Sequence, residues 1–384
     1  LASAIPLAKQ KVAWDDSALR GLSASTPFQQ RAGLLMRYET LIRAAFHPRW
    51  WNSTRIVHVA EDGSRSLRPH PQRALRDDEY TVLEYNFSLF FGLSIQLYEN
   101  TLISDDAPID RYFEGQSDAL SPAQLRGLAL FTSQTAPTAC SACHAGAEFT
   151  NASLRILQGA EGEPGEIVER MLNGECETVL YDQSFYNIGV RPTFEDIGLG
   201  ARDPFGNPLS VSELLSMDPA QVPSPELLQQ SYPNIANPPI ARGERTSTLG
   251  AFKVPSLRNV ELTAPYFHNG GELSLHDAVR FYNRGGNFRE TNVQFIDFEI
   301  GALGLSEAQI DDLVAFLRAL TDERVRRRSA PFDHPQLFVP DGAEVDASGH
   351  PVIEADGSAR DRMREIPAVG RRGGTPLPGF LEGF

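Results

Sequence analysis

The stretch Cys140-Ser141-Ala142-Cys143-His144 matches a chemically specific pattern, in which two cysteines stand two residues apart and a histidine follows at once. The pattern is typical of covalent haem c attachment. The two thiols bond to the vinyl groups of one porphyrin, and the adjoining imidazole becomes an axial ligand of the iron. Half of a zinc site is one alternative, but zinc needs two more ligands and the third cysteine of the chain is Cys176. The other alternative is a redox CxxC pair. Such a pair is typical of a βαβ unit, which the sequence does not indicate.

Composition and charge exclude several classes of protein. With 41% hydrophobic and 22% charged residues, the 384-residue chain has enough apolar mass for a globular core. Its net charge of −15 argues against nucleic acid or an anionic membrane surface as a partner. The most apolar run, residues 85–98, is too short and too polar to span a membrane, and favours a buried helix. Haem c ligation takes place outside the cytoplasm, so we expect a processed chain in the periplasm or beyond, with Cys176 as a free or half-buried thiol.

The strong periodic signals along the chain are helical. Capping-box patterns at Thr26 and Ser121, each with proline at the first helical position, predict helices running to Phe46 and Phe131. Another helix is expected within residues 78–102, and two more are expected to begin at Ser274 and Ser306. No run alternates convincingly with period two, and 31 glycines and 27 prolines indicate long loops. The expected fold class is all-α, a cytochrome c-like haem domain with long irregular loops and an N-terminal helical segment.

Several blocks around the haem motif carry a family resemblance. Residues 96–113 lead through Leu120-Ser-Pro-Ala-Gln-Leu-Arg-Gly-Leu-Ala-Leu-Phe131 into the motif. After it come Phe252-Lys-Val-Pro-Ser-Leu-Arg-Asn-Val-Glu-Leu-Thr-Ala-Pro-Tyr-Phe-His-Asn-Gly270 and Phe281-Tyr-Asn-Arg-Gly-Gly286. With the shorter blocks 186–193 and 330–335, they resemble the bacterial di-haem cytochrome c peroxidase superfamily over roughly residues 80–340. Within that superfamily, the likeness is closest to the rubber-oxygenase-like branch.

The resemblance implies two cytochrome c domains with one haem each, a tryptophan that carries electrons between them, and calcium at their interface. The motif here matches the second, C-terminal haem, because the Pro-Ser-Leu-Arg-Asn block and the final helix follow it. The sequence contains no first CxxCH, which would lie near or before Leu1. Either the chain is one piece of a longer precursor whose first haem domain was removed or is a separate polypeptide, or it is a mono-haem relative.

This reasoning predicts three segments and a function. Residues 1–118 form a helical segment left from the inter-haem region, residues 119–328 form the haem domain with a loop insertion at 157–250, and residues 329–384 form a C-terminal extension. The expected function is electron transfer as the C-terminal haem part of a di-haem peroxidase- or oxygenase-type oxidoreductase. Its partners would be a second haem domain or haem-bearing polypeptide, where peroxide or another substrate reacts, and a small redox donor protein. The alternative is a mono-haem electron-transfer or structural cytochrome subunit without catalysis of its own.

The resemblance also implies ligand and relay residues. His144 is the proximal ligand of the iron. Tyr282 stands where relatives carry methionine or tyrosine as the sixth ligand, although it also suits an ordinary core position. His334 is the other candidate for the sixth ligand. Trp50 and Trp51 are the best matches for the electron-relay tryptophan, and simple packing is the alternative for both.

Further residues are expected around the cofactor. His268 resembles a family histidine near the C-terminal haem, bonding a propionate or a loop. Arg258 and Arg284 suit charge-assisted hydrogen bonds to haem propionates, with loop-pinning as the alternative. Thr263 and Pro265 match positions whose backbone carbonyls bind the inter-domain calcium, for which hard oxygen donors are suited.

Overall fold

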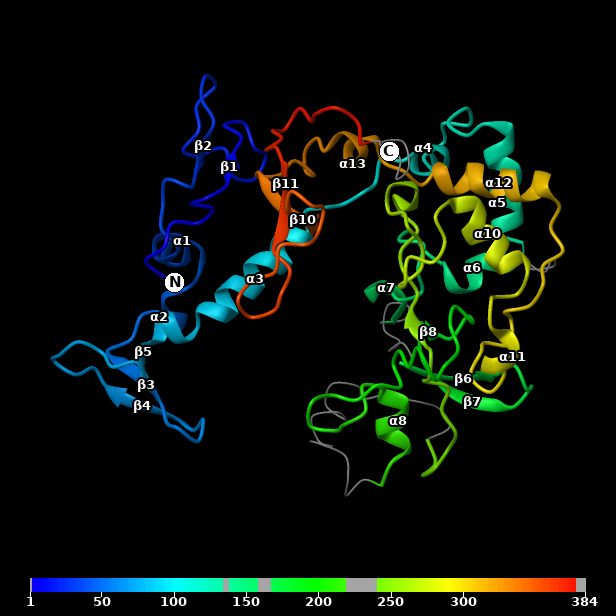
Figure 1. Cartoon of the computed structure of the whole chain (residues 1–384), viewed down its shortest axis with the longest axis horizontal. Coiled ribbons are helices and arrows are strands. Elements are labelled where there is room, and N and C mark those ends of the chain that lie inside the picture. Colours follow the sequence, from blue (N-terminus) through cyan, green and yellow to red (C-terminus); the bar gives the residue numbers. More distant parts are fainter. Residues whose placement is uncertain (1, 134–137, 158–166, 219–239, 378–384) are drawn as a thin grey trace. The chain divides into compact units, whose positions relative to one another are not determined.

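The computed structural model describes residues 2–133, 138–157, 167–218 and 240–377. These residues form two compact units (Figure 1). Unit 1 comprises Leu1–Asp105 and Glu323–Leu377, and unit 2 comprises Asp106–Asp322. Parts of the expected insertion and of the expected C-terminal extension lie outside the described residues. The three segments proposed from the sequence therefore remain a prediction.

Unit 2 is built around two crossing helices. Figure 1 shows α12 lying beside α5 and α10. The helices of the unit are α4 (Pro108–Phe113), α5 (Pro122–Phe131), α6 (Cys140–Cys143), α7 (Leu154–Leu157), α8 (Val211–Ser216), η3 (Val260–Leu262), α10 (Leu275–Asn283), α11 (Arg289–Asn292) and α12 (Glu307–Arg318). The predicted helix starts at Ser121, Ser274 and Ser306 are confirmed, because each side chain accepts a hydrogen bond from the backbone N–H three residues later. The apolar faces of α5, α10 and α12 enclose a core that includes Phe131, Val279 and Phe316.

The crossing of α5 and α12 depends on Gly127. A Cβ atom at this position would lie 2.0 Å from the carbonyl oxygen of Asp312 and 2.7 Å from the Cβ of Phe316. Only a residue without a side chain lets the two backbones approach so closely. Arg126 reinforces the crossing through two hydrogen bonds to the Asp312 carboxylate, at 2.7 and 2.6 Å.

Short strands form a second core in unit 2. The strands β6 (Val168–Leu172) and β7 (Thr178–Asp182) pair antiparallel, with Val168 opposite Asp182. The two-residue strands β8 (Phe185–Tyr186) and β9 (Phe252–Lys253) pair in the same sense. Their inner side chains bury Val179, Tyr181, Tyr186 and Val254.

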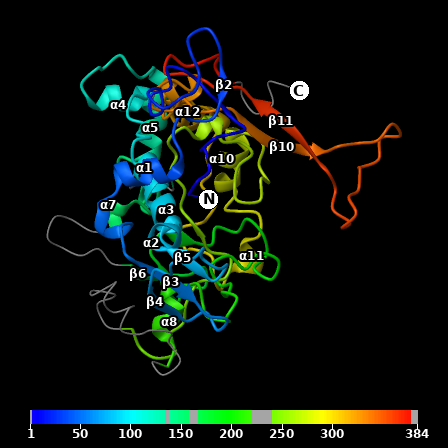
Figure 2. The same cartoon turned by 90° about the vertical axis from the view of Figure 1, so that its left-hand side faces the viewer.

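Unit 1 combines small sheets with one longer helix. Its elements are β1 (Lys11–Val12), β2 (Arg31–Ala32), α1 (Tyr38–Ala45), η1 (Pro48–Trp50), β3 (Arg55–Val59), β4 (Arg65–Pro69), β5 (Glu79–Thr81), α2 (Val82–Tyr85), α3 (Phe87–Glu99), α13 (Glu323–Arg327), β10 (Leu337–Ala343) and β11 (Asp361–Ile366). Strand β3 lies between β4 and β5, and β1 pairs with β2. Figure 2 shows β10 and β11 as a long two-stranded ribbon. Ile42, Leu83 and Phe90 form a small core with α1, α2 and α3.

The expected all-α class is wrong, because the described residues contain five small antiparallel sheets. Sequence analysis did not detect the strands because their burial does not alternate from residue to residue. Strand β7 is buried on both faces from Val179 to Asp182, whereas all five residues of β4 are exposed. Only a half-buried strand alternates apolar and polar residues, so neither of these strands has the period that sequence analysis detects.

The helix expected from Thr26 to Phe46 is also corrected. Only Tyr38–Ala45 is helical, and Thr26 and Gln29 instead exchange backbone hydrogen bonds of 2.9 and 3.2 Å across a two-residue turn. Phe28, at the tip of this turn, is 98% exposed. Proline at the first turn position sets the φ angle of a tight turn as readily as that of a first helical residue, so the same letters serve both structures.

Most of the apolar run at residues 85–98 lies in α3, as expected, but the expectation that this helix is buried is wrong, because Phe90 is its one buried residue. Within unit 1, other apolar side chains of α3, including Leu89, Phe91 and Leu97, are exposed. Among the described residues, no helix combines the length and the apolarity that a bilayer crossing requires.

Candidate functional site

The haem motif forms the one-turn helix α6 and the residue that ends it. The backbone N–H of His144 donates to the Cys140 carbonyl at 2.9 Å, which closes the turn. Residues three apart on a helix share a face, so Cys140 and Cys143 lie on the same side of α6. Cys140 packs against the core of α5, α10 and α12, and Cys143 packs against the core of the short strands. The pair therefore stands where the two apolar cores of unit 2 meet.

This apolar setting controls the chemistry of the two thiols. Burial raises the pKa of Cys140 to about 11 and that of Cys143 to about 12, and Asp297, Glu299 and Glu169 add to the effect at Cys143. Both thiols are thus protonated at neutral pH. Redox exchange requires a thiolate, whereas the thioether links of haem c are uncharged. Across the described ranges, no three His, Cys, Asp or Glu side chains group as a metal site would need. The surroundings fit haem c better than either alternative.

The imidazole of His144 is oriented by a backbone carbonyl. Its Nδ1 lies 3.2 Å from the carbonyl oxygen of Phe149. Burial lowers the pKa of His144, against the smaller opposing effect of the Phe149 and Pro255 carbonyls, so the ring is neutral at pH 7. A neutral ring whose Nδ1–H donates to a carbonyl has its Nε2 lone pair free for a metal. This is the arrangement that a proximal iron ligand requires.

Tyr282 lies in the same unit as the motif. It belongs to α10, and burial raises its pKa, followed by the effect of Cys143 and then of Cys140. Its ring centroid is 5.3 Å from that of Phe281 and 6.2 Å from that of Phe267, which makes an aromatic wall beside the cysteines.

His334, the other candidate for the sixth ligand, belongs to unit 1. Its Nδ1 lies 2.7 Å from the carbonyl oxygen of Pro335, and its backbone pairs with Val369. The structure thus puts Tyr282, and not His334, in the unit that holds the haem motif. Which of them binds iron remains a prediction.

The other residues expected near the cofactor have protein partners of their own. The Nε2 of His268 is 2.6 Å from an Asp196 carboxylate oxygen, and its ring stacks on Phe252 at 3.6 Å. Arg284 is exposed and donates to Glu272 and Asn287. Arg258 is engaged by a carboxylate and by a carbonyl of the loop after the motif.

The residues expected to bind calcium lie in unit 2, and the tryptophans expected to relay electrons lie in unit 1. Thr263 and Pro265 are exposed in the segment that follows η3. Trp50 and Trp51 belong to unit 1, away in sequence from the motif. The indole N–H of Trp51 donates to Phe46, and Trp50 is 45% exposed with the Arg49 guanidinium 4.8 Å from its ring centroid. Their proposed roles remain predictions.

An acidic group beside Cys143 was missed by sequence reasoning. The hydroxyl of Tyr186 donates to Glu169 at 2.6 Å and accepts from the Asn151 side chain at 2.9 Å. Asp297 is buried, and this burial, with the nearby Glu299 and Glu169, raises its pKa to about 6. The 186–193 block pointed to Tyr186, but no local pattern distinguishes Glu169 or Asp297 from other acidic residues of the chain.

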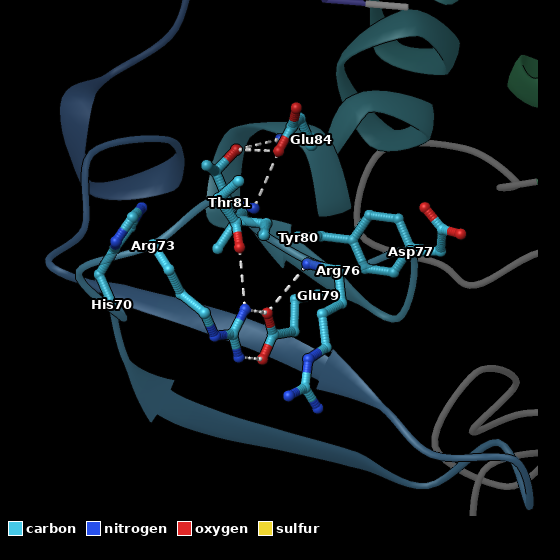
Figure 3. A pocket seen from close by; sticks show the side chains of 10 residues that line it. His70, Arg73, Arg76, Asp77, Glu79, Tyr80, Thr81 and Glu84 are labelled. Atoms are coloured by element: carbon cyan, nitrogen blue, oxygen red, sulfur yellow. Dashed lines mark hydrogen bonds and ion pairs between the residues drawn. The ribbon is translucent and has the colours of Figure 1, made fainter.

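A shallow depression in unit 1 is a weaker candidate for a site (Figure 3). Arg73 and Glu79 form a bidentate ion pair in it, with both distances at 2.7 Å, and Glu79 also accepts from the Arg76 N–H. The hydrogen bonds from Arg73 lower the pKa of Glu79 to about 2. These charges satisfy one another, so the depression offers little to a ligand.

Comparison with known proteins gives a consistent set of relatives. No protein-family model matches the chain. The chain is 30% identical over 226 residues to cytochrome-c peroxidase IdrP2 of Denitromonas iodatirespirans, covering 59% of this chain and 47% of the relative. It is 29% identical over 277 residues to IdrP1 of the same organism, covering 68% and 59%. It is 26% identical over 230 residues to the methylamine utilization protein MauG of Methylorubrum extorquens, covering 60% and 43%.

The chain therefore spans about half the length of the curated relatives it matches. A solved MauG-like protein associated with microbial copper homeostasis is 23% identical, with a TM-score of 0.37, and the match covers 60% of this chain and 55% of that one. A TM-score at this level does not establish a shared fold.

Proposed function

Because this chain belongs to the superfamily of bacterial di-haem cytochrome c peroxidases and MauG, we propose that it carries one haem c at Cys140, Cys143 and His144 and transfers electrons through it. The named relatives support haem-based oxidoreductase chemistry of the peroxidase type. We propose that this chain supplies the C-terminal haem of such an enzyme. The likeness to the rubber-oxygenase-like branch remains a prediction.

The environment of the motif is the observation that carries this proposal. Two protonated thiols on one face of α6 stand ready for thioether bonds, and the His144 Nδ1 contact with Phe149 leaves Nε2 free for iron. When bound, haem c supplies an iron atom that takes up and releases one electron. Cys140 and Cys143 would tether the ring, His144 would bind the iron, and the two apolar cores that meet at the cysteines would exclude water.

Tyr282 is the sixth ligand that we propose. It shares unit 2 with the motif, and both cysteines affect its pKa, so it lies near Cys140 and Cys143. A phenolate oxygen is a hard, anionic donor that stabilises ferric iron and lowers the reduction potential. The proposed role is thus electron storage and delivery at low potential.

The partners, location and relay follow from the family and not from this chain's geometry. We propose a second haem domain or haem polypeptide as the electron acceptor, a small redox protein as the donor, and the periplasm or the extracellular space as the location. Trp50 or Trp51 would serve as relay, and the carbonyls of Thr263 and Pro265 would bind calcium. The rival is a mono-haem cytochrome subunit without catalysis of its own.

The experiment that tests the proposal counts haems per polypeptide. Intact mass and a pyridine haemochrome assay on the purified chain should give one covalent haem. The Cys140→Ser/Cys143→Ser variant should lose it, while Cys176→Ser, which changes the remaining and exposed cysteine, should keep it. A colourless wild-type chain would reject the proposal. A peroxide assay of the chain with and without a co-purifying haem protein separates the enzyme part from the mono-haem rival, which predicts no turnover in either case.

A further inference from the structure

We propose that Arg258 and Asp110 form a clamp that positions the axial imidazole of His144, by holding the loop whose Phe149 carbonyl contacts its Nδ1. This inference rests on the proposed function, in which His144 is the iron ligand. It assigns Arg258 a positioning role in place of the propionate contact expected from the sequence.

The loop from Ala145 to Thr150 has a conformation that needs support. Thr150 N–H donates to the Ala145 carbonyl at 2.8 Å, and Phe149 N–H donates to the Gly146 carbonyl at 3.2 Å. Gly146 and Phe149 have φ angles of 72° and 51°. Positive φ is unrestricted for glycine but costs a bulky residue such as phenylalanine roughly 1–2 kcal/mol. Such a conformation persists only where the surroundings determine it.

Arg258 supplies much of that support from one side. Its Nε donates to the Ala147 carbonyl at 2.6 Å, and its two terminal nitrogens donate to the Asp110 carboxylate at 2.9 and 2.8 Å. Both side chains are only 16% exposed, so the pair is poorly screened by water. Asp110 is itself fixed in α4, where it also accepts from the Ala107 N–H at 2.9 Å. The planar guanidinium thus ties the loop to a helix.

Two further contacts hold the same loop. The Ser256 hydroxyl donates to the Glu148 carbonyl at 2.6 Å. The Phe149 ring lies 6.2 Å from the Phe131 ring and 6.3 Å from the Phe316 ring, with the Arg258 guanidinium 5.7 Å away. Loss of Arg258 removes the hydrogen bond to the Ala147 carbonyl, while the Ser256 bond to Glu148 and the packing of the Phe149 ring remain. We expect the Phe149 carbonyl to shift and its contact with His144 Nδ1 to weaken.

The reduction potential separates a positioning role from a purely structural one. A carbonyl that accepts from Nδ1–H makes the imidazole a more basic ligand, and a more basic ligand stabilises ferric iron. Weakening this hydrogen bond should raise the midpoint potential while the haem stays covalently attached. A clamp that served stability alone would lower the melting temperature and leave the potential unchanged.

The test compares holoprotein variants Arg258→Gln, Arg258→Lys and Asp110→Asn with the wild type. Arg170→Gln is the matched control, because Arg170 forms a similar pair with Glu244 at 2.6 and 3.1 Å in the same unit, with 20% and 24% exposure. For each variant we would measure the haem count, the midpoint potential by spectroelectrochemistry, and the ferric electron paramagnetic resonance spectrum, which reports imidazole orientation.

All variants should retain one haem. Arg258→Gln and Asp110→Asn should raise the potential and alter the resonance spectrum, and the control should match the wild type in both. Arg258→Lys should give an intermediate effect, since a lysine ammonium keeps the charge beside Asp110 but lacks the separate Nε–H that Arg258 donates to the Ala147 carbonyl. The clamp is rejected if Asp110→Asn and Arg258→Lys both leave potential and spectrum unchanged. A wild-type chain without haem would instead reject the proposed function, so the two failures are distinguishable.

Discussion

At the residue scale, the sixth ligand can be tested by removing one oxygen atom. Tyr282→Phe should change the ferric haem spectrum and raise the midpoint potential, because a phenolate ligand is lost while the ring still fills its place. Tyr266→Phe is the control, since Tyr266 is in the same unit and its hydroxyl donates to the Val260 carbonyl at 3.1 Å. His334→Ala should leave the spectrum unchanged. A spectrum that changes in His334→Ala and not in Tyr282→Phe would assign the ligand to unit 1.

The buried carboxyl of Asp297 predicts how the free energy of unfolding depends on pH. Burial, with Glu299 and Glu169, raises its pKa from 3.8 to about 6, so the folded protein holds the Asp297 proton more tightly than the unfolded chain does. The associated stability is fully present below about pH 4 and is lost as the pH rises through about 6. Asp297→Asn should therefore increase the free energy of unfolding at pH 7 by up to about 3 kcal/mol, at about 1.4 kcal/mol per pKa unit.

Denaturant titrations of holoprotein between pH 4 and 8 check this prediction. The advantage of Asp297→Asn should shrink as the pH falls from 7 towards 4, because the wild-type carboxyl becomes protonated in the folded state below about pH 6. The pH dependence of stability due to Glu79 has the opposite sign, because Arg73 lowers the pKa of Glu79 from 4.5 to about 2. The stabilising effect of Glu79 is present above about pH 4.5 and is lost as the pH falls through about 2. A pH-independent difference in Asp297→Asn would contradict the assignment.

Single residues also mark the limit of sequence reasoning about the site. The motif at residues 140–144 was readable because its chemistry is local. The partner of Arg258 was not, because Asp110 lies 148 residues earlier and no pattern links the two positions. Asp297 and Glu169 are likewise brought to Cys143 only by folding. The sequence left both a propionate contact and loop-pinning open for Arg258, and the structure adds its hydrogen bonds to Asp110 and to the Ala147 carbonyl.

At the scale of elements, the crossing of α5 and α12 reverses the usual effect of replacing a helical glycine. Alanine is normally favoured over glycine in a helix by about 0.5–1 kcal/mol. At Gly127 the new methyl group would meet the Asp312 carbonyl, so we expect Gly127→Ala to lower the free energy of unfolding by about 1–3 kcal/mol. Gly92→Ala, on α3 with no atom within 4 Å of its Cβ position, should instead stabilise. Equilibrium unfolding of both variants tests the pair, and equal effects would contradict this packing.

Elements that depend on local signals could be predicted from the sequence, and elements that depend on distant pairing could not. The helices beginning at Ser121, Ser274 and Ser306 were predictable because their caps span only four residues. The pairing of Tyr186 with Phe252 joins two-residue strands from distant parts of the chain, and two residues carry no periodicity. At Thr26 a local signal was present and misleading, because long-range context selects between a turn and a helix. Such short paired segments account for part of the wrong all-α expectation, and strands without alternating burial, such as β4 and β7, account for another part.

At the scale of the whole molecule, the two proposed axial ligands determine what one chain can do alone. With His144 and Tyr282 both on the iron, peroxide would have no open coordination position. We therefore expect the purified chain to show little peroxide turnover with a reduced donor, although it accepts and releases one electron per polypeptide.

Opening the position should change this result. In Tyr282→Phe the iron loses one ligand, so peroxide should react faster than with wild type in stopped-flow spectroscopy, whereas Tyr266→Phe should match wild type. The Cys140→Ser/Cys143→Ser variant gives the haem-free background. The enzyme proposal places the reaction with peroxide on a second haem. Adding a haem-bearing partner should therefore produce peroxide turnover with the wild-type chain as well as with the Tyr282→Phe variant. Fast turnover by the isolated wild-type chain would mean that its own haem is the reacting one, and the division of labour proposed here would be wrong.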